Sequence, residues 1–173
     1  HVEGALLVLA GPGSGKTRVM THRIAHMIAQ GVPAWEIVAL TFTNKAADEM
    51  KRRLAMLVPG QKVWAGTFHK FCATLLRRYA SLVGLKENFS IYDRDDQRKA
   101  LKQAIEEAEV ELFQYTPDEI ANKISWAKNQ LSSPEEYTAR PGDPLGSLVE
   151  RTYEAYQRRL LEANAADFDD LLY

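Results

Sequence analysis

The segment VLAGPGSGKT, Val8–Thr17, constrains the fold more than any other part of the chain. A run of aliphatic residues, Leu6–Leu9, stands directly before three closely spaced glycines and a Lys-Thr pair. Aliphatic residues on both faces predict a strand buried in a parallel sheet, which we expect at Ala5–Ala10. Glycine permits the positive φ angles that turn backbone N–H groups inward, and a helix N-terminus behind them favours an anion. The segment therefore predicts a phosphate-binding loop between a strand and a helix.

The loop follows the P-loop pattern G-x-x-x-x-G-K-[ST], except that its first position is the small Ala10. By the mechanics of that motif, Lys16 reaches the β- and γ-phosphates of a nucleoside triphosphate, and the Thr17 hydroxyl binds Mg²⁺. These two are the catalytic candidates, and Thr17 is also the metal ligand. An ordinary Gly-rich turn is the alternative, and the agreement of strand, loop, Lys-Thr and helix disfavours it. The candidates for nucleotide binding are Ala10, Gly11, Pro12, Gly13, Ser14, Gly15, Lys16 and Thr17.

Composition narrows the class of protein. A length of 173 residues suits one domain, or a domain with a sizeable insertion. No apolar stretch is long enough to span a bilayer, and no signal-peptide pattern opens the chain. The single cysteine, Cys72, excludes an internal disulfide and a cysteine zinc cluster, and the four histidines have no metal-ligand spacing. We therefore expect a cytoplasmic protein without membrane partners.

The net charge of −1 hides a division of charge along the chain. Residues 1–86 hold 12 Lys and Arg against 4 Asp and Glu, a net charge of +8. Residues 87–173 hold 10 against 19, a net charge of −9. This asymmetry indicates a polyanionic partner for the first half, with chance segregation of solvated charge as the alternative.

The first half alternates strands and helices, which predicts right-handed crossovers and a parallel sheet. The second half reads as helices, apart from a short extended piece at Phe89–Tyr92. It therefore predicts a helical subdomain appended to, or inserted into, an α/β domain. The expected strands of the first half are Ala5–Ala10, Ile37–Phe42 and Val63–Gly66, and its expected helices run from Lys16 to Gly31, Lys45 to Leu57 and Phe68 to Tyr79.

Helix-start signals divide the second half. Asp93 is expected to cap a helix that runs to about Ala108, and Thr116 with Pro117 opens a capping box. Ser133–Glu136 reads as a second capping box. Further along, Arg140–Gly146 reads as a loop, Ser147–Ala163 as a long helix, and the closing DFDDLLY as the start of another helix in which Asp169 and Asp170 are helix-start residues.

Polar and aromatic residues follow the second and third expected strands. Ligands of open α/β sheets bind at the carboxyl ends of the strands. Single-stranded nucleic acid needs aromatic faces for its bases and hydroxyls or helix N-termini for its phosphates. We interpret the residues after these two strands as contacts for single-stranded nucleic acid. Each of them has an alternative role: Phe42 in the core, Thr43 or Asn44 as a helix cap, and His69 as a surface histidine. We interpret Phe68 as core, because it belongs to the apolar stripe of its helix.

Six segments in order and spacing resemble UvrD/PcrA/Rep-type superfamily 1 DNA helicases. The first three motifs of that family are similar to AGPGSGKT, ALTFTNKAADEM and GTFHKFCATLLRR. FSIYDRDDQ, ISWAKN and ADFDDLL resemble the segments that enter, cross and leave its inserted helical subdomain. The resemblance implies a partial RecA-like P-loop ATP-binding domain at 1–88, whose parallel sheet is flanked by helices. It also implies an all-helical inserted subdomain at 89–164 and a return to the first domain at 165–173.

The resemblance also implies roles for individual residues. Lys16 and Thr17 would serve ATP and Mg²⁺, and Arg18 would lie near the nucleotide base. The family translocates 3′ to 5′ along one strand as two RecA-like domains close and open around ATP, and it acts at single-strand/double-strand junctions. We expect its adenine-reading glutamine, Walker B acids and arginine finger to lie outside these 173 residues, so the chain alone should not hydrolyse ATP. The residues that would meet single-stranded DNA are Phe42, Thr43, Asn44, Thr67 and His69.

Three other functions stay open. A subunit of a recombination helicase–nuclease would share these motifs and carry a nuclease domain further along. A small-molecule P-loop kinase would need a lid and an acceptor site, and would leave TFTNKAA and TFH unexplained. A non-catalytic nucleic-acid-binding P-loop module would bind single strands without dependence on ATP.

Overall fold

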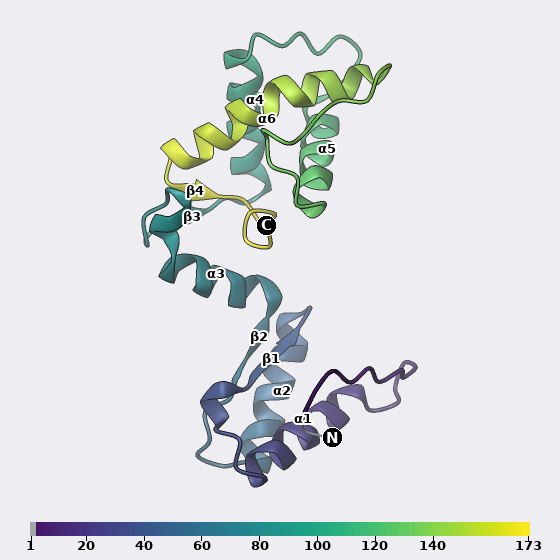
Figure 1. The fold of residues 1–173 in the computed structure, drawn as a ribbon, viewed down its shortest axis with the longest axis vertical. Helices are drawn as coiled ribbons and strands as arrows, with labels where there is room; N and C mark the ends of the chain where they lie inside the picture. Colours follow the sequence, from purple (N-terminus) through teal and green to yellow (C-terminus); the bar gives the residue numbers. More distant parts are fainter. Residues whose placement is uncertain (1–2) are drawn as a thin grey trace. The chain divides into compact units, whose positions relative to one another are not determined.

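The computed structural model describes residues 3–173 and divides into two compact units (Figure 1). The first unit ends at Phe71, and the second runs from Cys72 to Tyr173. Helix α3 (Phe68–Arg78) contains the division between them.

The first unit is an α/β layer, and its elements are α1 (Lys16–Ala29), the 3₁₀ helix η1 (Ala34–Glu36), β1 (Val38–Thr41), α2 (Asn44–Leu57) and β2 (Trp64–Thr67). Strands β1 and β2 pair in parallel, with Val38 opposite Trp64 and Thr41 opposite Thr67. Helix α2 connects them and packs against both, and α1 packs against α2. The buried core of this layer consists of Ile24, Ile37, Ala39, Met50, Leu54 and Ala65. The predicted second and third strands and the helix between them are therefore confirmed.

The predicted first strand, Ala5–Ala10, is wrong. No strand forms there, and the leucines that were expected to be buried lie open, with Leu7 82% and Leu9 87% exposed. Figure 1 shows this segment as an irregular trace leading to α1. Within residues 3–173 the first sheet contains only β1 and β2, so no ladder of backbone hydrogen bonds holds the segment extended. Aliphatic composition favours a strand only where a neighbouring strand accepts it.

The second unit is built around three helices, and its elements after α3 are η2 (Ala80–Val83), β3 (Ser90–Ile91), α4 (Arg94–Glu107), α5 (Pro117–Asn129), α6 (Pro144–Glu162) and β4 (Ala165–Ala166). Helices α4, α5 and α6 pack together around a core whose largest fully buried side chains are Leu101, Ile120, Ile124, Tyr153, Tyr156 and Leu160. A separate small cluster includes Ala80, Leu85 and Phe89, with Ala166 and Leu171 beside them.

The helix starts of the second unit follow the predicted caps, with two differences. The Asp93 carboxylate accepts the N–H groups of Asp95 and Asp96, and Thr116 forms a reciprocal capping box with Glu119 behind Pro117. At Ser133–Glu136 both hydrogen bonds of a capping box form, but they close a single turn and no helix follows.

The predicted loop Arg140–Gly146 ends early. Helix α6 begins at Pro144, three residues before the predicted start, because Asp143 caps it and accepts the N–H of Gly146. Proline at the first helical position loses no intrahelical hydrogen bond, so Asp143-Pro144 forms an effective helix start.

The expectation of helices alone after Asp93 is wrong at β4. Ala165 and Ala166 pair in parallel with Ser90 and Ile91, which brings the start and the end of the helical segment side by side. The two alanines are each 2% exposed, and two residues are too few to show a period. The segment after them forms turns and no helix. None of the helices within residues 3–173 has the length and apolarity to cross a membrane.

Candidate functional site

The predicted phosphate-binding loop adopts the backbone that its glycines permit. Gly13 has φ 72° and Gly15 has φ 88°, both in the left-handed region where a side chain would be strained. The Ser14 hydroxyl donates a 2.6 Å hydrogen bond to the carbonyl of Gly11, which closes the loop on itself. Gly15 is the N-cap of α1, and its carbonyl accepts the N–H of Val19. The loop therefore leads directly into a helix N-terminus, as the sequence predicted.

The Lys16 ammonium lies against this loop. Lys16 is the first residue of α1, and its Nζ donates to the carbonyls of Ala10 and Gly11 at 3.2 and 2.8 Å. The first turn of α1 holds no acidic residue, so nothing opposes the positive end of the helix dipole. Thr17 follows, half-buried, and Arg18 is exposed. A cation, a helix N-terminus and two positive-φ glycines in one loop fit the phosphates of a nucleotide.

Helix α1 is anchored immediately behind the loop. The buried Thr21 hydroxyl donates to the carbonyls of Thr17 and Arg18, at 3.1 and 3.0 Å. One turn further, Ile24 enters the core of the first unit. The start of α1 is thus tied to the packed layer, although the segment that precedes the loop is not.

A second group of candidates gathers where β1 and β2 end; we call Thr41–Asn44 together with Thr67–His69 the carboxyl edge. The parallel register places Thr41 opposite Thr67, so both strands end at the same level. The Thr43 hydroxyl accepts the N–H of Ala46 and caps α2, as one of the alternatives for this residue proposed. The Thr67 hydroxyl accepts the N–H of Lys70 in the first turn of α3. Two helices therefore begin beside each other at this edge.

Two phenylalanines form an exposed pair on the carboxyl edge. Phe42 is 89% exposed, which rules out the core alternative for it. Phe68 is 37% exposed, so the interpretation of Phe68 as core is wrong. The two ring centroids lie 5.1 Å apart at an interplanar angle of 36°. The apolar stripe of α3 misled the prediction because its next member, Phe71, packs on Trp64, while Phe68 lies in the first turn, just past the end of β2.

The remaining candidates surround this pair. Asn44 is the first residue of α2 and is exposed, and His69 is exposed in the first turn of α3. Neither α2 nor α3 has an acidic residue in its first turn. Helices α4 and α5 of the second unit do, with Asp95 and Asp96 in one and Asp118 and Glu119 in the other. The helix N-termini at the carboxyl edge can therefore receive an anion, whereas those of α4 and α5 are already neutralised.

The second unit contains a buried ionic cluster that no sequence pattern indicated. The Lys128 ammonium on α5 lies 2.8 Å from Asp167 and 2.7 Å from Asp170, and the Lys128 and Asp167 side chains are each 1% exposed. The Tyr156 hydroxyl donates to Asp167 at 2.8 Å, and Gln157 donates to Asp170 at 3.1 Å. The interpretation of Asp170 as a simple helix-start residue is therefore wrong. Lysine and aspartate are common surface residues, so only the fold shows that these three meet.

The two carboxylates of this cluster differ. Burial raises the pKa of Asp170 above its ordinary value, and the nearby charge of Lys128 only partly offsets the effect. Burial acts in the same direction on Asp167, but Lys128 and the hydrogen bonds from Tyr156 and the backbone outweigh it and lower the pKa of that carboxyl. One ammonium between two buried carboxylates leaves one negative charge in excess, and Asp170 is the group that takes up a proton first.

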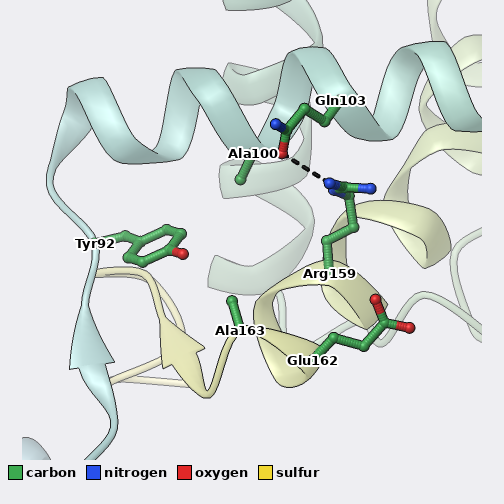
Figure 2. Close-up of a pocket in the computed structure, with 6 residues that line it drawn as sticks. All are labelled: Tyr92, Ala100, Gln103, Arg159, Glu162 and Ala163. Atoms are coloured by element: carbon green, nitrogen blue, oxygen red, sulfur yellow. Dashed lines mark hydrogen bonds between the residues drawn. The ribbon is translucent and has the colours of Figure 1, made fainter.

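A small open pocket of about 290 Å³ lies between α4 and α6 of the second unit (Figure 2). The guanidinium of Arg159 donates across it to Gln103 at 2.8 Å and to Glu107 at 3.0 Å. Arg159 and Gln103 thus bind each other across the pocket, and its two alanines offer no chemistry. Its lining consists of Tyr92, Ala100, Gln103, Arg159, Glu162 and Ala163, none of which the sequence had indicated.

Comparison with known proteins agrees with the motifs. A family model described as the UvrD/REP helicase N-terminal domain matches residues 1–173. The chain is 44% identical over 173 residues to the ATP-dependent DNA helicase PcrA of Bacillus subtilis. The aligned region covers 98% of this chain and 23% of that protein. It is 47% identical over 180 residues to the ATP-dependent DNA helicase UvrD1 of Mycobacterium bovis, covering 99% of this chain and 23% of that protein. The chain thus spans less than a quarter of the length of these relatives, and it belongs to the UvrD/REP helicase N-terminal domain family.

Proposed function

We propose that this chain is the ATP-binding and single-stranded-DNA-binding part of an ATP-dependent DNA helicase that moves 3′ to 5′ along one strand. The observation that carries the proposal is the carboxyl edge, where two capped, acid-free helix N-termini flank the exposed Phe42–Phe68 pair. A fold needs neither exposed phenylalanines nor acid-free helix starts for its own stability. When a single strand binds, the phenylalanine rings can stack on its bases and the helix N-termini can hold its phosphates.

The P-loop is the proposed site for ATP and Mg²⁺. Lys16 would leave the loop carbonyls for the β- and γ-phosphates, and the loop N–H groups and the start of α1 would hold the same oxygens. Thr17 would bind the Mg²⁺ that neutralises phosphate charge, and Arg18, exposed beside it, would lie near the base. The loop residues Ala10–Gly15 would line the phosphates.

The carboxyl edge is the proposed site for the DNA strand. A base would stack on the exposed Phe42 ring, which is worth about 1–3 kcal/mol for an aromatic side chain. Thr43, Asn44, Thr67 and His69 would contact the sugar–phosphate backbone at the two helix starts. The net charge of +8 on residues 1–86 supports this assignment, because phosphate neutralisation supplies most of the non-specific affinity for DNA.

We propose that the helical segment 89–164 is an insertion into a RecA-like domain, which covers 1–88 and resumes at 165–173. The pairing of the two ends of the segment supports this. Ser90, which enters the segment, pairs with Ala165, which leaves it. Parallel pairing at the base lets a chain depart and return at one place. We propose that the helicase is completed by a second RecA-like domain and by the acids and arginine of hydrolysis, all outside these residues.

The test uses the full-length helicase and three variants. Lys16→Ala should abolish DNA-stimulated ATP hydrolysis and unwinding, because the β/γ charge loses its cation. Thr17→Ala should resemble it through the loss of Mg²⁺ coordination. Phe42→Ala should weaken binding to single strands and leave melting unchanged. Unwinding by the Lys16 variant at the wild-type rate would refute the nucleotide assignment, and nuclease activity in the wild type would favour the helicase–nuclease subunit.

A further inference from the structure

We propose that Phe68 is a positioning residue, which holds the Phe42 ring in place before DNA arrives. The inference rests on the proposed function of the carboxyl edge and deepens it. Phe68 was expected in the core. Its ring instead contacts the ring of Phe42, with the two centroids 5.1 Å apart. Offset aromatic pairs with centroids about 4.5–7 Å apart attract each other beyond their loss of water contact.

The Phe42 side chain has little else to hold it. It is 89% exposed, and it stands on the short link between β1 and α2. Its neighbours hold the backbone: the Thr41 hydroxyl donates to the carbonyl of Thr43 and accepts its N–H, and the Thr43 hydroxyl caps α2. The backbone at Phe42 is thus bound on both sides, whereas its ring has the Phe68 ring as its described aromatic neighbour.

Phe68, by contrast, stands on a fixed base. It follows Thr67, which pairs with Thr41 across the sheet, and the Thr67 hydroxyl holds the first turn of α3. Three residues on, Phe71 packs edge-on against Trp64 of β2, with centroids 5.2 Å apart and planes at 68°. These contacts tie α3 to the strand end beside which Phe42 lies.

The consequence is preorganisation of the stacking ring. A free phenylalanine on a surface samples several rotamers, and binding a base selects one of them at an entropic cost. Packing against Phe68 restricts the Phe42 ring in advance while one of its faces stays in solvent. Phe68 need not touch DNA to raise affinity for it.

The experiment compares variants of the full-length helicase for binding to single-stranded DNA over a range of salt concentrations. Phe68→Leu should weaken binding by about 2- to 12-fold, the range of an aromatic pair. The slope of affinity against salt should not change, because the phosphate contacts remain. Phe68→Tyr keeps a ring and should restore wild-type affinity. Trp35→Leu is the matched control, since Trp35 is 78% exposed on η1 before the amino end of β1, and should bind as wild type.

Two further measurements distinguish positioning from direct contact. The double variant Phe42→Leu with Phe68→Leu should bind no more weakly than Phe42→Leu alone, because Phe68 acts through Phe42. Photocrosslinking to 5-iodouracil in the DNA should label Phe42, in tryptic peptide 24–45, and the Phe68→Leu variant should give a lower yield there. Additive losses, or a crosslink in peptide 63–70 at Phe68, would show direct contact and overturn the inference.

The remaining outcomes separate this inference from the proposed function. If Phe42→Leu weakens binding and Phe68→Leu does not, the DNA site stands and the positioning role of Phe68 is refuted. If neither the wild type nor any variant binds single strands, the proposed function of the carboxyl edge fails, and this inference fails with it. Thermal melting of each variant shows whether a loss of binding follows from unfolding. Phe68→Tyr keeps the aromatic ring, so it distinguishes loss of the ring contact from loss of the fold.

Discussion

The ammonium of Lys128 lies 2.8 Å from the carboxylate of Asp167, and each of the two side chains is 1% exposed. Lys128 belongs to α5, whereas Asp167 follows β4, so the pair fixes the segment that leaves the helices against a helix in their middle. Asp170 shares the same ammonium at 2.7 Å. A buried charge that loses its partner destabilises the folded state, so removal of Lys128 should destabilise the second unit.

Lys128→Met should lower the free energy of unfolding by about 3–5 kcal/mol, because two carboxylates would stay buried with no cation between them. Urea unfolding, followed by circular dichroism, measures the loss. Lys102→Met is the control, since Lys102 is exposed on α4, and should change stability by less than about 0.5 kcal/mol. Equal stability of the two variants would mean that water reaches the cluster.

The cluster also predicts an unusual dependence of stability on pH. The pKa of Asp170 is raised above 3.8 in the folded chain, so the folded state takes up that proton first and gains stability as pH falls towards 3.8. The pKa of Asp167 is lowered, so its contribution is present above 3.8 and is lost only below it. The free energy of unfolding of the wild type minus that of Asp170→Asn should therefore increase as the pH is lowered from neutral to about 4. A fall over this window would contradict the assignment of the raised pKa to Asp170.

Gly66→Ala should destabilise the first unit by about 1–3 kcal/mol, the usual cost of overpacking. A Cβ at this position of β2 would lie 2.7 Å from Cη2 of the Trp64 ring, so the indole must move away from its contact with Phe71. Thermal melting measures the effect. In a Trp64→Leu background the same substitution should cost much less, because the ring that it meets is gone. Equal costs in both backgrounds would place the strain elsewhere in β2.

The isolated 173-residue chain should not hydrolyse ATP at a useful rate. Lys16, Thr17 and the loop amides approach the phosphates from one side, and hydrolysis needs charge neutralised from several sides with water held in line. Asp167 and Asp170 are already bound to Lys128, so they do not serve a metal ion. A malachite-green assay with single-stranded DNA and Mg²⁺ tests this, with Lys16→Ala as the control. Turnover above that control would mean that an acid in these residues holds the metal.

What the sequence could predict depended on how local the signal was. The positive φ angles of Gly13 and Gly15 and the caps at Asp93 and Thr116 depend on only a few neighbouring residues, and the structure shows each of them. Apolar runs proved ambiguous, because burial depends on partners far along the chain. Residues 5–10 have a strand composition and no neighbouring strand, and Phe68 lies on an apolar stripe yet is partly exposed.

The candidate site shows the same division. Strand ends in register placed Phe42, Thr43, Asn44, Thr67 and His69 together, as the rule for parallel sheets predicts. The contact between Phe42 and Phe68 was not predictable, because the two rings follow different strands and no local pattern pairs them. The Lys128 cluster joins residues about forty positions apart, and no short-range pattern marks such a pair.

The pairing of β3 with β4 has a consequence for how this family can vary. Two adjacent parallel strands lie about 4.8 Å apart. Residues 92–164 connect β3 to β4, so the two ends of this segment are held at that spacing. Changes in the length of α4, or in the part of α6 away from β4, leave this spacing unchanged. A replacement of α5 must keep Lys128, because its ammonium binds Asp167 and Asp170 directly after β4. The helices of the second unit can therefore vary for new contacts as long as this one ionic cluster and the β3–β4 pair are kept.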